Sequence, residues 1–181
     1  MTKQALRTTL LRRLKQQEEG ERLRKSEAIR RGLARVGVFR QAKTVGCYVS
    51  LSYEVETRRL ITQMLEAGKR VVVPVVRGKR LILSELRDPE RDLSPGAHGV
   101  LEPAPSAVRP VPLQDVDLML VPGLGFDRLG HRLGHGLGYF DRFLARLPKT
   151  TATIGLCFDF QQLDRLPIAP HDYAVQRVLA A

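Results

Sequence analysis

The chain has 181 residues, of which 43% are hydrophobic, and a formal net charge of +11 at pH 7. This length and hydrophobic content predict a single domain, residues 1–181, with a core of its own. No segment approaches the ~20 apolar residues of a membrane-spanning helix, and the amino terminus lacks the apolar core of a signal peptide. We therefore expect a soluble protein with no membrane partner.

The two cysteines, Cys47 and Cys157, both lie inside apolar runs. This placement favours small buried side chains in a reducing compartment over a disulfide framework or a metal site. The expected location is the cytoplasm.

Positive charge is concentrated in the first 40 residues, which hold twelve Lys and Arg against four Glu, whereas the rest of the chain holds eighteen against fifteen acidic residues. Such an excess predicts an anionic partner. On charge alone, that partner is a nucleic acid, a membrane surface or a phosphorylated small molecule.

Apolar periodicity predicts helices at the amino terminus. Leu6, Leu10 and Leu14 recur every fourth residue, and a second helical pattern follows Gly20. We expect two helices within residues 3–36, with the excess Arg on their polar faces.

The next segments alternate between strand and helix patterns. The β-branched run 44–51 predicts a buried strand, and Thr57 then opens a helix that Gly68 ends. Further strands are expected at 70–76 and, as an edge or excursion strand, at 81–86.

Six of the eleven prolines lie in residues 87–113, which predicts a long surface connection. A strand at 118–121, a glycine-rich loop at 123–138, a helix at 139–147 and a strand at 151–158 follow. Alternating strands and helices predict an α/β fold of three layers, αβα, in which a mostly parallel, Rossmann-like sheet carries helices on both faces.

The glycine-rich loop holds six of the fifteen glycines and joins an apolar strand to a helix. Glycine allows positive φ and a close approach of backbone N–H groups to a ligand, and the first turn of a helix adds unpaired donors. We expect this loop to bind an anion, most naturally a phosphate. No Gly-Lys-Ser/Thr closes the loop, and its glycine spacing does not match the dinucleotide fingerprint.

Four ordered blocks resemble the 5-formyltetrahydrofolate cyclo-ligase family, also called 5,10-methenyltetrahydrofolate synthetase. They are Lys3-Gln-Ala-Leu-Arg7, Leu51-Ser-Tyr-Glu-Val-Glu-Thr57, the segment from Pro122-Gly-Leu-Gly-Phe-Asp to Arg132-Leu-Gly-His-Gly-Leu-Gly-Tyr-Phe-Asp-Arg, and Pro170-His-Asp172. The resemblance covers nearly the whole chain. It implies a three-layer αβα fold and an enzyme that uses ATP and Mg²⁺ to convert 5-formyltetrahydrofolate to 5,10-methenyltetrahydrofolate, ADP and phosphate.

The reaction implied by the resemblance begins with phosphorylation of the formyl oxygen, after which N10 attacks and phosphate leaves. Such catalysis depends on in-line placement and charge compensation, not on a covalent nucleophile. The family then implies Arg132 and Lys3 as catalytic residues. It implies ATP contacts from Lys3, Gln4, Ala5, Leu6, Arg7, Arg132, Leu133, Gly134, His135, Gly136, Leu137, Gly138, Tyr139 and Phe140.

The resemblance also implies a folate site and a metal site. Glu54 would hydrogen-bond the pterin and Val49 would pack against it, and the folate would also touch His135, Gly136, Leu137, Gly138 and Tyr139. Asp141 and Asp172 would hold Mg²⁺, since hard carboxylate oxygens suit that ion.

Each of these residues also has a structural interpretation. Lys3 and Arg7 fit a solvated helix face, and Glu54 fits a residue that introduces the helix capped by Thr57. Asp141 is favourable in the first turn of a helix, and Asp172 can form an Asx turn.

The His and aromatic residues of the glycine region do not indicate a different kind of site. His131 and His135 lack partners at zinc spacing, so a His metal site is not expected. One ring of Tyr139 and Phe140 is expected to stack on pterin and the other to join the core.

The chain departs from the commonest family pattern at Leu137, where Gly or Lys is frequent, at Phe140, where Tyr is common, and in a tail without the usual terminal strand pattern. An alternative from another class is an RNA-binding module that uses the basic N-terminal helices. A third is a related sheet enzyme acting on sugar phosphates or coenzyme A thioesters. The enzyme hypothesis predicts ATP and 5-formyltetrahydrofolate as partners, no nucleic acid, and a monomer or homodimer.

Overall fold

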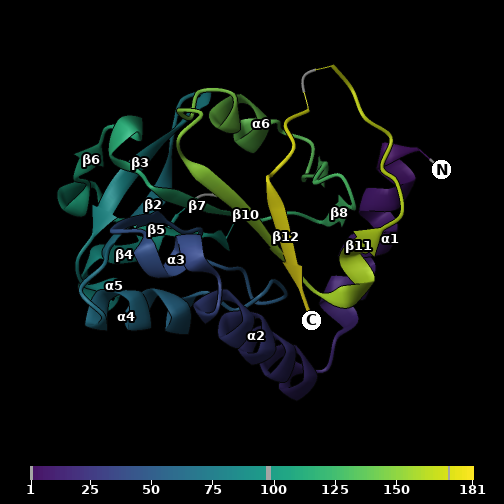
Figure 1. Cartoon of the computed structure of the whole chain (residues 1–181), viewed down its shortest axis with the longest axis horizontal. Helices are drawn as coiled ribbons and strands as arrows, with labels where there is room; N and C mark the ends of the chain where they lie inside the picture. The colour runs from purple at the N-terminus through teal and green to yellow at the C-terminus, as the bar shows by residue number, and fades with distance from the viewer. Residues whose placement is uncertain (1, 97–98, 171) are drawn as a thin grey trace.

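The computed structural model describes residues 2–96, 99–170 and 172–181 (Figure 1). His171 of the Pro170-His-Asp172 block lies outside these residues. The helices are α1 (Lys3–Gln16), α2 (Glu19–Ala34), α3 (Gly37–Gln41), α4 (Arg58–Glu66), α5 (Pro89–Asp92) and α6 (Tyr139–Leu144), with 3₁₀ turns η2 (Pro105–Ala107), η3 (Leu113–Asp115) and η4 (Asp159–Gln161).

The strands are β1 (Thr44–Gly46), β2 (Arg70–Arg77), β3 (Arg80–Leu86), β4 (Leu93–Pro95), β5 (Leu101–Pro103), β6 (Pro110–Val111), β7 (Leu118–Val121), β8 (Gly125–Asp127), β9 (Arg132–Leu133), β10 (Ala152–Cys157), β11 (Gln162–Leu163) and β12 (Arg177–Ala180). None of the helices in the described part of the chain combines the length and hydropathy needed to span a bilayer.

A seven-stranded sheet with the order β12-β10-β7-β1-β2-β3-β6 lies at the centre. Neighbouring strands from β12 to β2 pair in parallel, and β3 is antiparallel to both β2 and β6. The strand order reverses direction between β1 and β7. In open α/β sheets, ligands bind at such a switch point, beyond the carboxyl ends of the strands.

Strand β7 shows why the fold has three layers. Leu118 and Leu120 pack in a core with α1 to α4, whereas Met119 and Val121 point to the other face and pack in a core with α6. All four side chains are fully buried, as expected for a central parallel strand covered on both sides. Figure 1 shows α2, α3 and α4 along one face of the sheet and α6 on the other. The predicted α/β class with a mostly parallel sheet is confirmed.

The strand expected over 44–51 is shorter and ends at Gly46. Beyond it, the Thr57 side chain forms hydrogen bonds with the backbone that a neighbouring strand would otherwise form. The Thr57 hydroxyl donates to the Tyr48 carbonyl at 2.7 Å and accepts from the Ser50 amide at 3.0 Å. The Cys47 amide still donates to the Val72 carbonyl at 2.9 Å, and residues 48–51 then leave the sheet. Thr57 does not cap α4 with its side chain; instead the Glu56 carboxylate accepts from the Arg58 amide at 2.7 Å.

The glycine-rich stretch is more regular than the expected loop. Its first half forms the antiparallel pair β8–β9, and β11 adds to β8 in parallel, giving a small second sheet. The helix that follows is α6, which ends at Leu144 and not at residue 147. The tail, despite its unusual sequence, forms the parallel edge strand β12.

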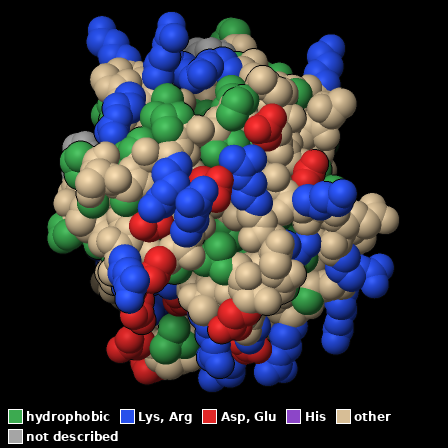
Figure 2. Space-filling model, turned by 90° about the vertical axis from the view of Figure 1, so that its left-hand side faces the viewer, with side chains coloured by type: hydrophobic (Ala, Val, Ile, Leu, Met, Phe, Trp, Pro, Cys, Tyr) green, Lys and Arg blue, Asp and Glu red, His purple; other side chains and the backbone are tan. Residues whose placement is uncertain are grey.

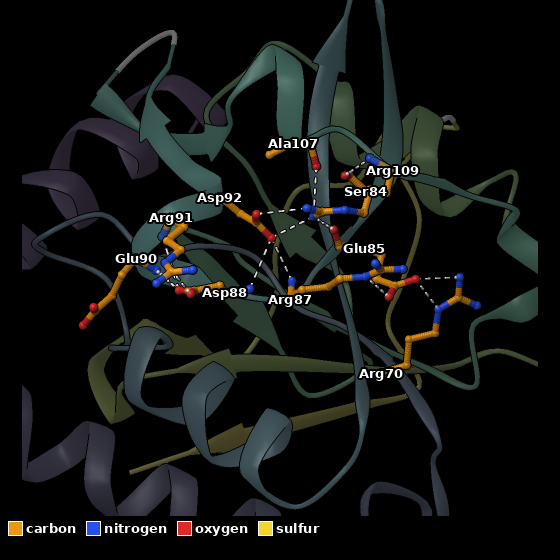
Figure 3. A network of polar contacts seen from close by, with 10 residues as sticks. All are labelled: Arg70, Ser84, Glu85, Arg87, Asp88, Glu90, Arg91, Asp92, Ala107 and Arg109. Carbon is orange, nitrogen blue, oxygen red and sulfur yellow. Dashed lines mark hydrogen bonds and ion pairs between the residues drawn. The ribbon is translucent and has the colours of Figure 1, made fainter.

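The proline-rich connection is held to the sheet by an ion pair whose carboxylate is buried and whose guanidinium is partly exposed (Figure 3). Asp92, whose side chain is 8% exposed, accepts two hydrogen bonds from the Arg109 guanidinium, at 2.8 and 3.2 Å, and one from the Arg87 amide at 2.9 Å. The Arg109 amide in turn donates to the Ser84 hydroxyl on β3 at 2.9 Å. Segment 87–109 is thus closed by charge-assisted hydrogen bonds, which are stronger than neutral ones.

Asp92→Asn should lower the free energy of unfolding at pH 7 by roughly 2 kcal/mol. Hydrogen bonds from Arg109, opposed by burial, lower the pKa of Asp92 from 3.8 to about 2. The carboxylate therefore stabilises the folded state above about pH 4, and this contribution is lost as pH falls from 4 to 2. Denaturant unfolding between pH 2 and 7 checks this. The control Glu90→Gln, on the same short helix, should unfold like the parent. If Asp92→Asn also gave the same unfolding curves as the parent, the prediction would be contradicted.

Candidate active site

A cavity of about 330 Å³ opens at the switch point, between the segments that follow β1 and β7. The region after β1 supplies Tyr48, Val49 and Glu54, and the region after β7 supplies Pro122 and Gly123. The remaining lining residues are Leu51, Tyr53, Pro74, Val76, Leu81, Val100, Leu101, Glu102, Arg132, Gly134, His135, Leu137, Gly138, Tyr139, Phe140 and Asp141. The expected position of the glycine-rich segment, at the carboxyl ends of the strands, is confirmed.

Arg132 lies on β9 at the floor of this cavity, with a side chain only 4% exposed. Its Nη2 donates to Asp141 Oδ1 at 2.8 Å, its Nη1 donates to the Pro122 carbonyl at 3.3 Å, and its Nε has no hydrogen-bond partner within the described residues. Burial lowers the pKa of the guanidinium, and the charges of Asp141 and Asp172 oppose that shift. An arginine remains cationic at neutral pH, so the site holds a desolvated positive charge with an unused donor.

Helix α1 brings two more cations to the same place. Arg7 Nε donates to the Gly134 carbonyl at 3.0 Å, and Lys3 Nζ forms an ion pair with Asp172. Residues four apart share one face of a helix, so Lys3 and Arg7 lie on the same side of α1, where Arg7 reaches the glycine segment and Lys3 reaches Asp172. Gln4 supports Arg7 through a bond of 3.4 Å, whereas within the described residues no polar contact connects Ala5 or Leu6 to the site.

The glycine segment keeps its backbone accessible next to Arg7. Gly136 and Gly138 have φ of 105° and 67°, a conformation that side chains rarely adopt. Arg7 Cζ lies only 3.5 Å from where a Cβ on Gly136 would stand. Leu133 is buried in the core, so only its backbone can meet a ligand, while Leu137 at the cavity mouth is 59% exposed. Phe140 packs edge-on against Phe143 at 6.0 Å, and its ring belongs partly to the core.

The residues expected to bind the pterin line the cavity opposite α6. Val49 is buried in the lining. One oxygen of Glu54 accepts from the Leu51 amide at 2.9 Å, and the other lies 3.9 Å from His135 Nε2. Glu54 therefore closes its own turn, and does not introduce α4 as the structural interpretation expected; its other oxygen points toward the glycine segment.

Each carboxylate expected to hold a metal is paired with a cation. Asp141 binds Arg132, and Asp172 binds Lys3 while its Oδ2 accepts from the Ala169 amide at 2.7 Å. The charges of both carboxylates raise the pKa of the Arg132 guanidinium against the effect of burial. Within the described residues, no group of three or more His, Cys, Asp and Glu forms a metal cluster, and His131 instead binds Asp127. Two carboxylates suit Mg²⁺ that keeps water and phosphate ligands.

Two residues that sequence reasoning missed hold the site together. Asp127, with a side chain 1% exposed, accepts from the amides of Leu129, His131 and Leu166 and from His131 Nδ1, at 2.9 to 3.1 Å. Burial raises the pKa of Asp127, but these hydrogen bonds outweigh it and leave the pKa below its ordinary value. Buried Gln161 donates to the carbonyls of Gly123 and Leu124. Asp127 stood within a quoted motif, whereas nothing in the sequence marks Gln161.

The model of the 5-formyltetrahydrofolate cyclo-ligase family matches residues 1–181. The chain belongs to this family. A 5-formyltetrahydrofolate cyclo-ligase from Mycolicibacterium smegmatis is 35% identical over 182 aligned residues, which cover 98% of this chain and 93% of the relative. The mouse 5-formyltetrahydrofolate cyclo-ligase is 30% identical and the match covers 98% and 92%.

Solved structures agree with the family assignment. The NMR structure of Aquifex aeolicus 5,10-methenyltetrahydrofolate synthetase superposes with a TM-score of 0.87 at 33% identity, covering 99% of this chain and 90% of that one. A Mycoplasma pneumoniae synthetase shares the fold, with a TM-score of 0.79 at 23% identity. Membership in a cyclo-ligase family makes the chain an enzyme of the ligase class and does not support the RNA-binding alternative.

Asp127→Asn should destabilise the fold by about 1–3 kcal/mol, because the amide cannot accept from all four buried donors. It should also raise the KM for ATP, since Asp127 ties β8–β9, which carries Arg132, to the segment that leads to Asp172. Thermal unfolding and steady-state kinetics measure the two effects.

The matched control is Asp164→Asn. Arg128 and Asp164 join the same two segments at 2.8 Å, but their side chains are 82% and 89% exposed. Exposed pairs contribute little, so this variant should keep the parent melting temperature and KM. If Asp127→Asn and Asp164→Asn had the same melting temperature and the same KM for ATP, Asp127 would not stabilise the site.

Proposed function

We propose that residues 1–181 form one catalytic domain that converts 5-formyltetrahydrofolate and ATP to 5,10-methenyltetrahydrofolate, ADP and phosphate. The observation that carries this proposal is the buried Arg132 guanidinium, which lines the apolar cavity close in sequence to the glycine contacted by Arg7 of α1 and whose Nε has no hydrogen-bond partner among the described residues. The cavity accepts a flat, largely apolar ring system, and the cations accept a triphosphate.

In the proposed reaction the formyl oxygen attacks the γ-phosphorus and ADP leaves. N10 then attacks the activated carbon, the carbon–oxygen bond breaks, phosphate departs and N10 loses its proton. Arg132 compensates the charge that develops on the transferred phosphoryl group, and Lys3 holds the ATP phosphates. The backbone from Leu133 to Phe140 fits around the phosphates, with the Gly136 and Gly138 amides open to them.

The folate occupies the cavity with its pterin against Val49 and Glu54. Glu54 Oε1 accepts from the pterin N–H groups, and His135 and Tyr139 contact the ring system from the glycine segment. Mg²⁺, when bound to Asp141 and Asp172, neutralises phosphate charge and orients the transferred group. Binding of MgATP requires Lys3 and Arg132 to exchange carboxylate partners for phosphate oxygens, a change among groups of similar geometry.

The reaction is tested by mixing the folded protein with 5-formyltetrahydrofolate and MgATP and following the methenyl product by absorbance. We expect a signal that requires ATP. If the folded protein gave no ATP-dependent signal, the proposal would be contradicted.

Lys3→Ala should raise the KM for ATP about tenfold or more, because it removes a charge-assisted contact of roughly 1.5–3 kcal/mol. Its KM for folate should change little. Arg12→Ala, an exposed change on the same helix, is the control. If both variants keep the parent KM, Lys3 does not bind nucleotide.

Asp141→Asn should raise the Mg²⁺ concentration needed for half-maximal activity, since the amide is a weaker ligand for a hard cation. A Mg²⁺ titration at saturating ATP measures this, with Asp164→Asn as the control. A titration that matches the parent would leave Asp141 only as the partner of Arg132.

A further inference from the structure

Five exposed cations gather beside one end of the cavity. Arg77, Lys79 and Arg80 surround the β2–β3 turn, and Arg142 and Arg146 come from α6 and the residues just after it. Within residues 2–96, 99–170 and 172–181, none of the five forms an ion pair, in contrast to Lys25 and Arg70. Figure 2 shows Lys and Arg spread over much of one face of the molecule, including its upper end.

Hydrogen bonds hold the turn and α6 together in this arrangement. The Tyr139 hydroxyl donates to the Gly78 carbonyl at 3.2 Å, Arg142 Nη2 to the Lys79 carbonyl at 3.4 Å, and Arg146 Nη1 to the Leu81 carbonyl at 3.2 Å. Arg142 and Arg146 are therefore held beside the β2–β3 turn by contacts to neutral carbonyls, which leave their charge uncompensated.

The β2–β3 register adds further repulsion. Arg77 and Arg80 are direct cross-strand partners, and Lys79 lies in the turn between them. Like charges placed opposite each other on neighbouring strands are destabilising. A bound anion would relieve that repulsion.

The cluster is continuous with the cavity. Val76 and Leu81 line the cavity and directly neighbour Arg77 and Arg80 in the chain. Tyr139 lines it too, and the Arg142 guanidinium carbon lies 5.3 Å from the centre of its ring. The carboxylates of the lining are Glu54, Asp141 and Glu102; the first two are engaged by Leu51 and Arg132, and Glu102 lies on β5.

We propose that Arg77, Lys79, Arg80 and Arg142 form an anion subsite for the carboxylates at the glutamate end of the folate. This rests on the proposed function. A folate carries its pterin at one end and two carboxylates at the other, joined by a flat aminobenzoyl group. With the pterin at Glu54, the apolar lining of Val76 and Leu81 accommodates the middle of the molecule, and the cations beyond meet the carboxylates. The subsite is separate from Lys3, Arg7 and Arg132, which face the phosphates.

The test uses 5-formyltetrahydrofolate and its bis-amide, in which both glutamate carboxylates are neutral, with binding measured by calorimetry in the absence of ATP. The parent should bind the acid about three- to tenfold more tightly than the bis-amide, as expected for exposed ion pairs, and added salt should reduce the difference. The double variant Arg77→Gln/Arg80→Gln should lose this preference while binding the bis-amide like the parent. Its KM for ATP should be unchanged.

The control Arg58→Gln/Arg59→Gln removes the same charge from α4 and should keep the preference. Equal weakening of both compounds in the Arg77/Arg80 variant, an unchanged preference, or a raised KM for ATP would each overturn the subsite. A parent protein that binds neither compound would instead overturn the proposed folate function, so the two failures are distinguishable.

Discussion

The ion pair between Arg132 and Asp141 is the interaction around which the site is built. A guanidinium with 4% of its side chain exposed is stable only with a carboxylate in contact, because leaving one buried charge alone costs several kcal/mol. The same principle applies to Lys3 and Asp172. Without ligands, each cation expected to meet phosphate is therefore neutralised by a carboxylate expected to meet metal. MgATP carries negative phosphates and a positive metal ion. Its phosphates can replace the carboxylates as partners of Arg132 and Lys3, and its metal ion can replace these cations as partner of the carboxylates.

This arrangement depends on a rigid support. Asp127 fixes the β8–β9 turn through four hydrogen bonds, and Gln161 holds the backbone that enters it. The Val175 amide also donates to the Gly130 carbonyl, so the segment before β12 is tied to the hairpin at a second point. Gly136 and Gly138, with positive φ, follow this hydrogen-bonded hairpin, and Gly136 lies beside Arg7.

The sequence predicted the three-layer class, the helical amino terminus and the position of the glycine segment, since these follow from periodicity and from glycine clustering. It overestimated the length of β1. A hydrogen bond from Thr57 to the Tyr48 carbonyl, nine residues away, ends that strand, and a contact of this kind leaves no periodic pattern in the sequence. It missed β12, whose pairing with β10 compensates for a weak strand pattern. Asp127 and Gln161 act through buried hydrogen bonds that include distant backbone groups, Leu166 for Asp127 and Gly123 and Leu124 for Gln161. The roles of Lys3, Arg132, Asp141 and Asp172 came from the family resemblance, not from local pattern.

The contact between Lys3 and Asp172 joins residues 169 positions apart. During translation at about 5–20 residues per second, the ribosome releases the first helix roughly 10–30 s before its partner has been made. Until then Lys3 of α1 lacks its carboxylate partner, although the sheet residues up to β7 are already present. The proposed nucleotide site can therefore form only after Asp172 has been made, which places it among the last parts of the molecule to mature.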